Sequence, residues 1–272
     1  MFFFGSERPI NKEKSMTQHQ YATYPSLKGR KVLITGGATG IGESFVSRFA
    51  EQGTRVAFLD IQDEPAEKLA AQIAANGYPH PIYLHCDMTD LDAVRAAVAQ
   101  AIGKLGGLDI LINNAANDQR HTIEEVTPEL WDRLMSVNLR HQFFVTQAAI
   151  PALKQSGSGS IINMSSIGWI IPSVGLPVYV TAKAAIMGLT RTLAHELGVH
   201  NIRVNCLLPG AIVTEKQRRL VLTPEYSAEI LANQALKREL VPDEVARLAL
   251  FLAADDSSAI TGQGHIVDGG WV

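Results

Sequence analysis

The sequence has few cysteines and no cluster of metal-binding residues. Only two cysteines occur in 272 residues, and both Cys86 and Cys206 lie in apolar stretches typical of strands. This pattern excludes a disulfide framework and predicts two buried thiols in a reducing compartment, for which we expect the cytoplasm. No cysteines and histidines have the spacing of metal ligands, so we expect no metal site.

The sequence also has little excess of charge of either sign and no long hydrophobic run. The formal net charge is −3, which argues against the basic surface of a nucleic-acid-binding protein. No apolar run approaches the roughly 20 residues of a membrane span. The apolar start at residues 1–5 is too short for the core of a secretory signal. Apart from this start, residues 1–20 are mostly polar, and they are aperiodic. We interpret them as a disordered leader or an extension, with Met16 as an alternative start.

Hydrophobic residues, in contrast, make up 46% of the chain, enough for a sizeable core. Short apolar runs predict strands at residues 31–35, 55–60, 82–86, 109–113, 160–164, 202–208 and 264–268. Segments with helical periodicity separate them, at residues 41–52, 65–76, 91–105, 131–154, 179–197 and 242–254. Strands separated by helices of this length form parallel βαβ units.

The sequence therefore predicts an α/β fold with a Rossmann-like, doubly wound parallel sheet of about seven strands and helices on both faces. Residues 21–272 are expected to form a single dinucleotide-binding catalytic domain. The least regular stretch is residues 211–226. We interpret it as a mobile lid over a site.

A glycine-rich turn joins the first predicted strand to the first predicted helix, over residues 35–42. Gly36, Gly40 and Gly42 allow a tight turn in which main-chain N–H groups approach a pyrophosphate closely. The start of the following helix adds a favourable dipole for an anion. The context of strand, turn and helix predicts a dinucleotide site.

Two carboxylates at strand ends extend this predicted cofactor site. Asp60 ends the second strand and can accept hydrogen bonds from the hydroxyls of the adenosine ribose. Neither Thr39 nor Ile61 supplies a cation for a 2′-phosphate, so NAD is favoured over NADP. Asp87 follows the third strand, where it either bonds the adenine edge or caps the next helix.

The chemistry is expected at Tyr179 and Lys183, which are four residues apart on a predicted helix and therefore share one face. A nearby ammonium and a positively charged nicotinamide would both lower the tyrosine pKa, making the phenol a proton acceptor for a substrate hydroxyl. Ser166 lies upstream and can hold the substrate oxygen. This arrangement predicts hydride transfer between a nicotinamide and an alcohol or carbonyl.

On these motifs the chain resembles the short-chain dehydrogenase/reductase family. Further matching positions are residues 113–116, Asn138 and Pro209-Gly210 with Thr214. The resemblance implies that Tyr179 is the acid/base, that Ser166 stabilises the substrate oxygen and that Lys183 binds the nicotinamide ribose. It also implies a water held by Asn138 in a proton relay to Lys183, and a cofactor carboxamide contact from Thr214. The expected cofactor contacts are together Gly36, Thr39, Gly40, Ile41, Gly42, Asp60, Asp87, Asn114, Tyr179, Lys183, Pro209, Gly210 and Thr214. One departure is Ala116, where the family usually has glycine.

Polar residues after the fourth strand point to the substrate, because open α/β sheets bind ligands at the carboxyl ends of strands. They suit a polyhydroxylated ligand better than a steroid or a fatty acyl chain, which favour an apolar pocket. Besides Ser166 and Tyr179, the candidates are Asn117, Asp118, Arg120, His121, Arg140 and Trp169. Other interpretations stay open. The loop residues could be solvated or form an ion pair, Arg140 and His141 could make a subunit or helix contact, and Trp169 could pack in the core.

Within the family, residues 117–121, 137–141 and 270–271 are most similar to NAD-dependent sugar 1-dehydrogenases of the D-xylose-like aldose type. This similarity implies oxidation of the anomeric hydroxyl of a pentose or hexose to an aldonolactone, and a homotetramer. A second hypothesis is a family member acting on another alcohol or carbonyl, such as a 3-oxoacyl thioester or a cyclic alcohol. A third is a non-catalytic NAD sensor, which the intact Tyr179–Lys183 pair disfavours.

Overall fold

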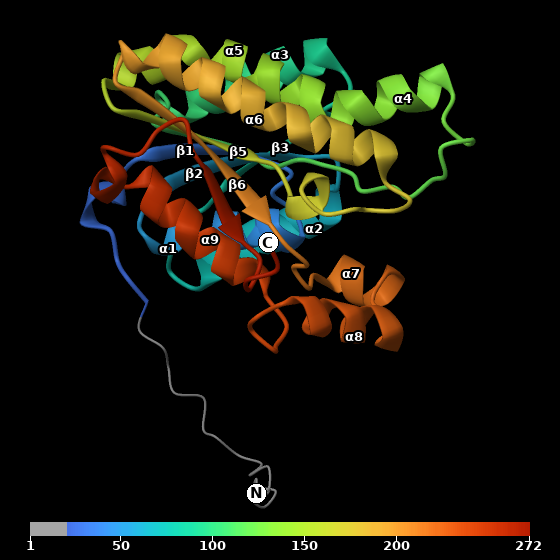
Figure 1. Ribbon diagram of the computed structural model, residues 1–272. Coiled ribbons are helices and arrows are strands. Elements are labelled where there is room, and N and C mark those ends of the chain that lie inside the picture. Colours follow the sequence, from blue (N-terminus) through green and yellow to red (C-terminus); the bar gives the residue numbers. More distant parts are fainter. Residues whose placement is uncertain (1–20) are drawn as a thin grey trace, which may run out of the picture.

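The predicted strands assemble into one parallel sheet in the computed structural model, which describes residues 21–272 (Figure 1). The interpretation of residues 1–20 as a leader lies outside the described residues. The strands are β1 (Lys31–Thr35), β2 (Arg55–Asp60), β3 (Ile82–His85), β4 (Ile110–Asn113), β5 (Gly159–Met164), β6 (Ile202–Pro209) and β7 (Gly264–Val267). Their order in the sheet is β3-β2-β1-β4-β5-β6-β7, and every pair is parallel. The predicted fold class is confirmed.

The helices are α1 (Gly40–Glu51), α2 (Asp63–Ala75), α3 (Leu91–Leu105), α4 (Pro128–Met135), α5 (His141–Ser156), α6 (Pro177–Gly198), α7 (Glu215–Leu220), α8 (Pro224–Asn233) and α9 (Pro242–Ala253). Short helical turns are η1 (Pro25–Leu27), η2 (Ser136–Arg140), η3 (Ile167–Trp169) and η4 (Asp255–Ser257). Helices α3, α5 and α6 cover one face of the sheet, and α1, α2 and α9 cover the other (Figure 1).

Alternation along the strands explains this sandwich of three layers. In β1, Val32 and Ile34 lie in a buried cluster with Phe45 of α1. Leu33, between them, lies in a second cluster with Val94 of α3. Successive side chains of a strand point to opposite faces, so a strand that is apolar throughout requires helices on both sides.

The segment between β6 and α9 differs from the prediction of irregular structure over residues 211–226. It forms α7 and the start of α8, so that prediction is wrong. Thr214 and Thr223 cap these helices by accepting hydrogen bonds from Gln217 N and Tyr226 N. Threonine at the cap is a helix-start signal, and it outweighed the weak periodicity of these short helices.

The predicted helix over residues 131–154 is one continuous helical segment made of α4, η2 and α5. At η2 the turn widens to a π-helix. Such turns often occur at functional sites, and this one carries Asn138.

Cys86 and Cys206 are buried and unpaired, as predicted. None of the helices within residues 21–272 combines the length and apolarity needed to cross a bilayer. The same part of the chain contains no group of three or more His, Cys, Asp or Glu residues arranged to hold a metal ion.

Candidate active site

A cleft of about 1370 Å³ lies at the carboxyl ends of the strands, between the β1 and β4 connections that run to opposite faces of the sheet. This is the point where doubly wound sheets bind ligands. The volume exceeds the roughly 300–1,000 Å³ of a pocket for a single small ligand. The cleft therefore has room for a dinucleotide and a small substrate together.

The glycine turn forms one end of this cleft, and its glycines are required by close contacts. A Cβ atom at Gly42 would lie 1.7 Å from the Gly36 carbonyl oxygen. At Gly36, φ is +67° and a Cβ atom would lie 2.7 Å from the Ala115 Cα. The side-chain amide of Asn114 donates to the carbonyls of Thr35 and Gly36, at 3.1 and 2.8 Å, and so fixes the turn. The turn leads directly into the N-terminus of α1, so this end of the cleft fits a pyrophosphate.

Asp60 borders the same end of the cleft and is 7% exposed. Its carboxylate accepts hydrogen bonds from Ala38 N and Gln62 N, at 2.9 and 3.0 Å. These bonds hold the glycine turn against β2. Each carboxylate oxygen has a second lone pair, so the side chain retains the capacity to accept bonds from ribose hydroxyls.

Asp87 also lines the cleft. It accepts bonds from the amide and hydroxyl of Thr89, both at 2.8 Å. The cap of α3 is instead Asp90, which accepts from Asp92 N and Ala93 N. The alternative interpretation of Asp87 as the helix cap is therefore wrong, and its contact with adenine stays a prediction.

Tyr179, Lys183 and Ser166 all line the cleft. The first two lie on one face of α6, with Lys183 Nζ 5.5 Å from the centre of the Tyr179 ring. The lysine is 1% exposed and donates to the Met164 carbonyl at 2.8 Å. Ser166 follows β5 in an extended conformation. The structure thus places a phenol, an ammonium and a hydroxyl where a substrate can reach them.

The pKa of Tyr179 is raised, mainly by burial and further by the negative charge of Asp118, while the Ser166 hydroxyl acts in the opposite direction. The expectation of a lowered tyrosine pKa is wrong for the protein side chains alone, because burial is the largest effect. Burial also lowers the pKa of Lys183 to about 8, against the opposing effects of Cys206 and Asp118.

Asn138 does not line the cleft. Its side-chain amide accepts from Asn117 N and donates to Asn117 O, both at 2.9 Å. It also donates to the Leu134 carbonyl at 3.0 Å. These bonds hold the loop after β4 in place, and the relay water stays a prediction.

His141 directly follows η2 as the first residue of α5 and is fully buried. Its Nε2 bonds the Ala115 carbonyl at 2.9 Å. Burial, helped by the charge of Lys183, lowers its pKa to about 3. A neutral imidazole therefore supports the loop after β4, so this contact is with a loop and not with a helix.

Of the predicted substrate residues, Asn117, Asp118 and Arg120 line the cleft together with Ser166 and Tyr179. The structure does not bring the other three to it. His121 is buried, with its amide bonded to Gly175 O and its Nδ1 near Thr122 O.

Trp169 and Arg140 also lie away from the cleft lining. The indole of Trp169 donates to Ser165 Oγ at 3.1 Å, and the guanidinium of Arg140 donates to the Thr89 carbonyl at 2.8 Å. Arg140 borders a separate apolar hollow formed by α4, η2, α5 and α6. The subunit or helix-contact interpretation fits it better.

Several polar and aromatic cleft residues were missed from the sequence: Lys216, Gln217, Arg219, Tyr226 and Trp271. Four of them lie on α7 and α8. The threonine caps of these helices were the available signal, because a helix turns a defined set of side chains toward the cleft. That the segment acts as a mobile lid stays a prediction.

Comparison with known proteins decides the family. The family model described as "Enoyl-(Acyl carrier protein) reductase" matches residues 36–272. A protein of Rhizobium meliloti (strain 1021) named "Probable galactose dehydrogenase" is 50% identical over 247 residues, which are 91% of this chain and 96% of that protein. The chain belongs to the short-chain dehydrogenase/reductase family.

Other members of the short-chain dehydrogenase/reductase family are similar over the same length. D-xylose 1-dehydrogenase of Caulobacter vibrioides (strain NA1000 / CB15N) is 48% identical over 250 residues, 92% of this chain and 98% of that enzyme. The solved structure of a 7α-hydroxysteroid dehydrogenase in complex with NADH and 7-oxoglycochenodeoxycholic acid matches with a TM-score of 0.86 at 32% identity. It covers 91% of this chain and 96% of that one. The protein is therefore an oxidoreductase of this family.

Proposed function

We propose that this protein oxidises the anomeric hydroxyl of an aldose, a pentose or a hexose, to the aldonolactone with NAD as the oxidant. The observation that carries the proposal is the polar wall of Asn117, Asp118 and Arg120 in the same cleft as Tyr179. Carboxylate, amide and guanidinium groups match the hydroxyls of a sugar. The relatives named for galactose and D-xylose support this substrate class.

Three side chains of the cleft have separate roles in the proton transfer. Ser166 holds the substrate oxygen, and Tyr179 as phenolate takes the proton from the anomeric hydroxyl. Lys183 places a positive charge 5.5 Å from the phenol ring, which favours the phenolate. When bound, NAD would supply the hydride acceptor next to the anomeric carbon. The sugar thus gives up a hydride to the coenzyme and a proton to Tyr179, which together are two electrons and two protons.

Asp60 supports NAD rather than NADP as the coenzyme. Its carboxylate would repel a 2′-phosphate, and neither Thr39 nor the exposed Ile61 offers a compensating cation. We expect a strong preference for NAD in kcat/KM and a weaker one in Asp60→Ala. Comparable values for the two coenzymes in the wild type would contradict it.

The apolar hollow beside Arg140 supports a homotetramer, which is also part of the proposal. It has a volume of about 410 Å³, and its lining residues are Met135, Leu139, Arg140, Phe143, Phe144, Ala185 and Leu189. Phe143 is 44% exposed and lies in this contiguous apolar hollow, which is the kind of surface that another subunit can cover. Sedimentation analysis tests the tetramer.

We also propose a cytoplasmic location, in keeping with the buried free thiols. Residues 21–272 are proposed to form a single catalytic domain.

The test of the substrate class is a panel of pentose and hexose epimers, cyclic alcohols and 3-oxoacyl thioesters, each with NAD(H) and NADP(H). Reduced coenzyme is followed by its absorbance. We expect the best kcat/KM with an aldose, and an altered ranking of epimers in Arg120→Ala, because a polar site left with unpaired groups discriminates sharply. Arg140→Ala is the matched control, since its guanidinium lies outside the cleft lining. If cyclic alcohols or thioesters outperform every aldose, the sugar proposal fails.

A further inference from the structure

The carboxylate of Asp118 joins two walls of the cleft that are far apart in the sequence. Its Oδ1 lies 2.6 Å from Lys216 Nζ. Its Oδ2 accepts a hydrogen bond from Gln217 Nε2 at 3.1 Å. Asp118 follows β4, whereas Lys216 and Gln217 form the first turn of α7, and all three side chains line the cleft. Both oxygens of one carboxylate are thus held by neighbouring residues of the same helix.

A second contact links the same two walls. The guanidinium of Arg120 lies 5.9 Å from the centre of the Tyr226 ring on α8. The loop after β4 therefore holds both α7 and α8. In contrast, Arg218 on α7 pairs with Glu239 at 2.6 Å and does not line the cleft. The helix thus carries two ion pairs of similar length, of which one faces the site.

The ion pair that faces the site also acts on the charge around Tyr179. The charged residues that line the cleft are Glu43, Asp60, Asp87, Asp118, Arg120, Lys183, Glu215, Lys216 and Arg219. Among these, Asp118 is the one whose charge raises the Tyr179 pKa. Burial would raise the pKa of Asp118 itself, but Lys216 and, more weakly, Arg120 bring it below its usual value. Asp118 is therefore ionised at neutral pH, and Lys216 offsets its charge.

We propose that Lys216 and Gln217 are positioning residues of the reaction. They hold α7 over the substrate end of the cleft through Asp118, and Lys216 offsets the negative charge that Asp118 places beside the base Tyr179. The proposal rests on the proposed function for the role of Tyr179, and it does not depend on which alcohol is oxidised.

The test is the pH dependence of kcat/KM with the best substrate of the panel. Loss of the cation in Lys216→Met leaves the charge of Asp118 without its ion-pair partner, so the acid limb should move to higher pH by about half a unit. Loss of the carboxylate in Asp118→Asn should move the same limb to lower pH. The KM of the substrate should rise about two- to fivefold in Lys216→Met, the range for a half-exposed ion pair. Lys216→Arg keeps the cation and should restore the wild-type limb.

Arg218→Met is the matched control, because it breaks the other ion pair of the same helix. It should leave the position of the acid limb unchanged. If Lys216→Met and Arg218→Met give the same profile, or if Lys216→Met and Asp118→Asn shift it in one direction, the proposal is overturned. Should Lys216→Met fail to fold, the shift in Asp118→Asn decides alone, and its absence overturns the proposal. If a non-sugar alcohol is the best substrate of the panel, the aldose proposal is refuted. The pH profiles of the variants can then still be compared with that alcohol as substrate.

Discussion

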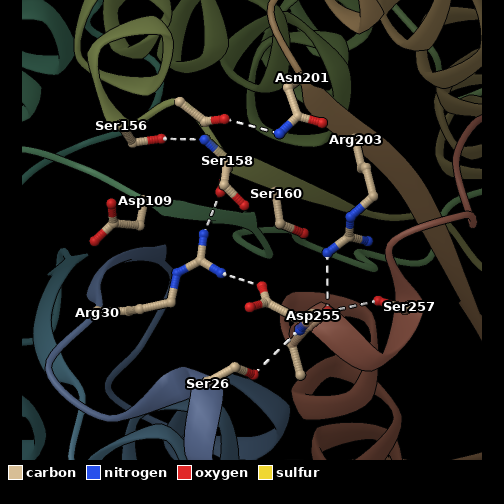
Figure 2. Close-up of polar contacts among 12 residues, drawn as sticks. Ser26, Arg30, Asp109, Ser156, Ser158, Ser160, Asn201, Arg203, Asp255 and Ser257 are labelled. Carbon is tan, nitrogen blue, oxygen red and sulfur yellow. Dashed lines mark hydrogen bonds and ion pairs between the residues drawn. The ribbon is translucent and has the colours of Figure 1, made fainter.

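The two ends of the parallel sheet use similar polar side chains in different ways. At the amino end, Arg203 donates to the carbonyls of Leu252 and Ala254, at 2.8 and 3.2 Å. Arg30 pairs with Asp255 at 3.3 Å and donates to the Ser158 carbonyl (Figure 2). At the carboxyl end, charged and amide side chains instead line a cleft of about 1370 Å³.

The direction of the helices explains this difference. In a parallel sheet with crossover helices, helix C-termini lie at the amino ends of the strands, where unpaired carbonyls and the negative end of the dipole attract cations. Leu252 belongs to the last turn of α9, and Ser158 follows α5. Helix N-termini lie at the other end, where free N–H groups attract anions. Arginines at the amino end thus stabilise the fold, while the carboxyl end can bind a ligand.

The largest effect that separates the two ends is expected for Tyr179→Phe. Loss of the phenolic hydroxyl removes the proton acceptor, which costs roughly 10²–10⁴-fold in rate. The free energy of unfolding and the affinity for NAD should stay near the wild-type values. Steady-state kinetics and a coenzyme fluorescence titration measure both. A variant within about threefold of the wild-type kcat/KM would remove Tyr179 from the mechanism.

Two glycine-to-alanine substitutions in helices compare a glycine at the ligand-binding end of the sheet with one that makes no close contact. Gly42→Ala places a methyl group 1.7 Å from the Gly36 carbonyl, so the turn must open and NAD affinity should fall at least about tenfold, the effect of a loss of 1.4 kcal/mol. Gly103→Ala in α3 meets no atom within 4 Å, and should stabilise the protein by about 0.5–1 kcal/mol through helix propensity. Thermal unfolding with and without NAD distinguishes them. Equal NAD affinity in the two variants would contradict the close-contact argument.

At the amino end, Arg203→Met should lower the free energy of unfolding by about 1–3 kcal/mol, because charged donors to helix carbonyls are lost. The kcat and KM should not change, since the site lies at the opposite end of the strands. Arg55→Met is the control, because the exposed Arg55 makes one weaker bond to Lys104 O at 3.3 Å. It should stay within about 0.5 kcal/mol of wild type. Urea unfolding gives the stabilities. A change of kcat in Arg203→Met would break the proposed separation between the ends.

The smallest effect at neutral pH is expected for His141. Burial lowers its pKa from 6.5 to about 3. The unfolded chain therefore binds a proton below pH 6.5 that the folded chain does not, and stability falls as pH falls through this window, by at most about 1.4 kcal/mol per pH unit. His141→Gln can still donate to the Ala115 carbonyl, and it should show a shallower loss between pH 6.5 and 3. Identical pH slopes of the unfolding free energy would show that the imidazole does not titrate in this way.

Local patterns made much of the fold and part of the site predictable. Seven apolar runs and the intervening helical periods indicated the sheet, and every predicted strand end lies within one residue of the observed one. Tyr179 and Lys183 share a helix face by their spacing alone. In contrast, Arg140 was predicted at the substrate, yet the wide turn of η2 and the bond to Thr89 direct it elsewhere. Side chains project from a helical segment in all directions, and only tertiary packing decides which of them reach the cleft.

The sequence by itself determined the glycine turn, the carboxylate at the end of β2 and the Tyr179–Lys183 pair, because each depends on neighbours a few residues away. Only the tertiary structure decided that Asp118 meets Lys216 and that His121 is buried. It also decided that burial, rather than Lys183, dominates the Tyr179 pKa. Desolvation and long-range pairing depend on which segments the fold packs together, and no local pattern of residues carries that information.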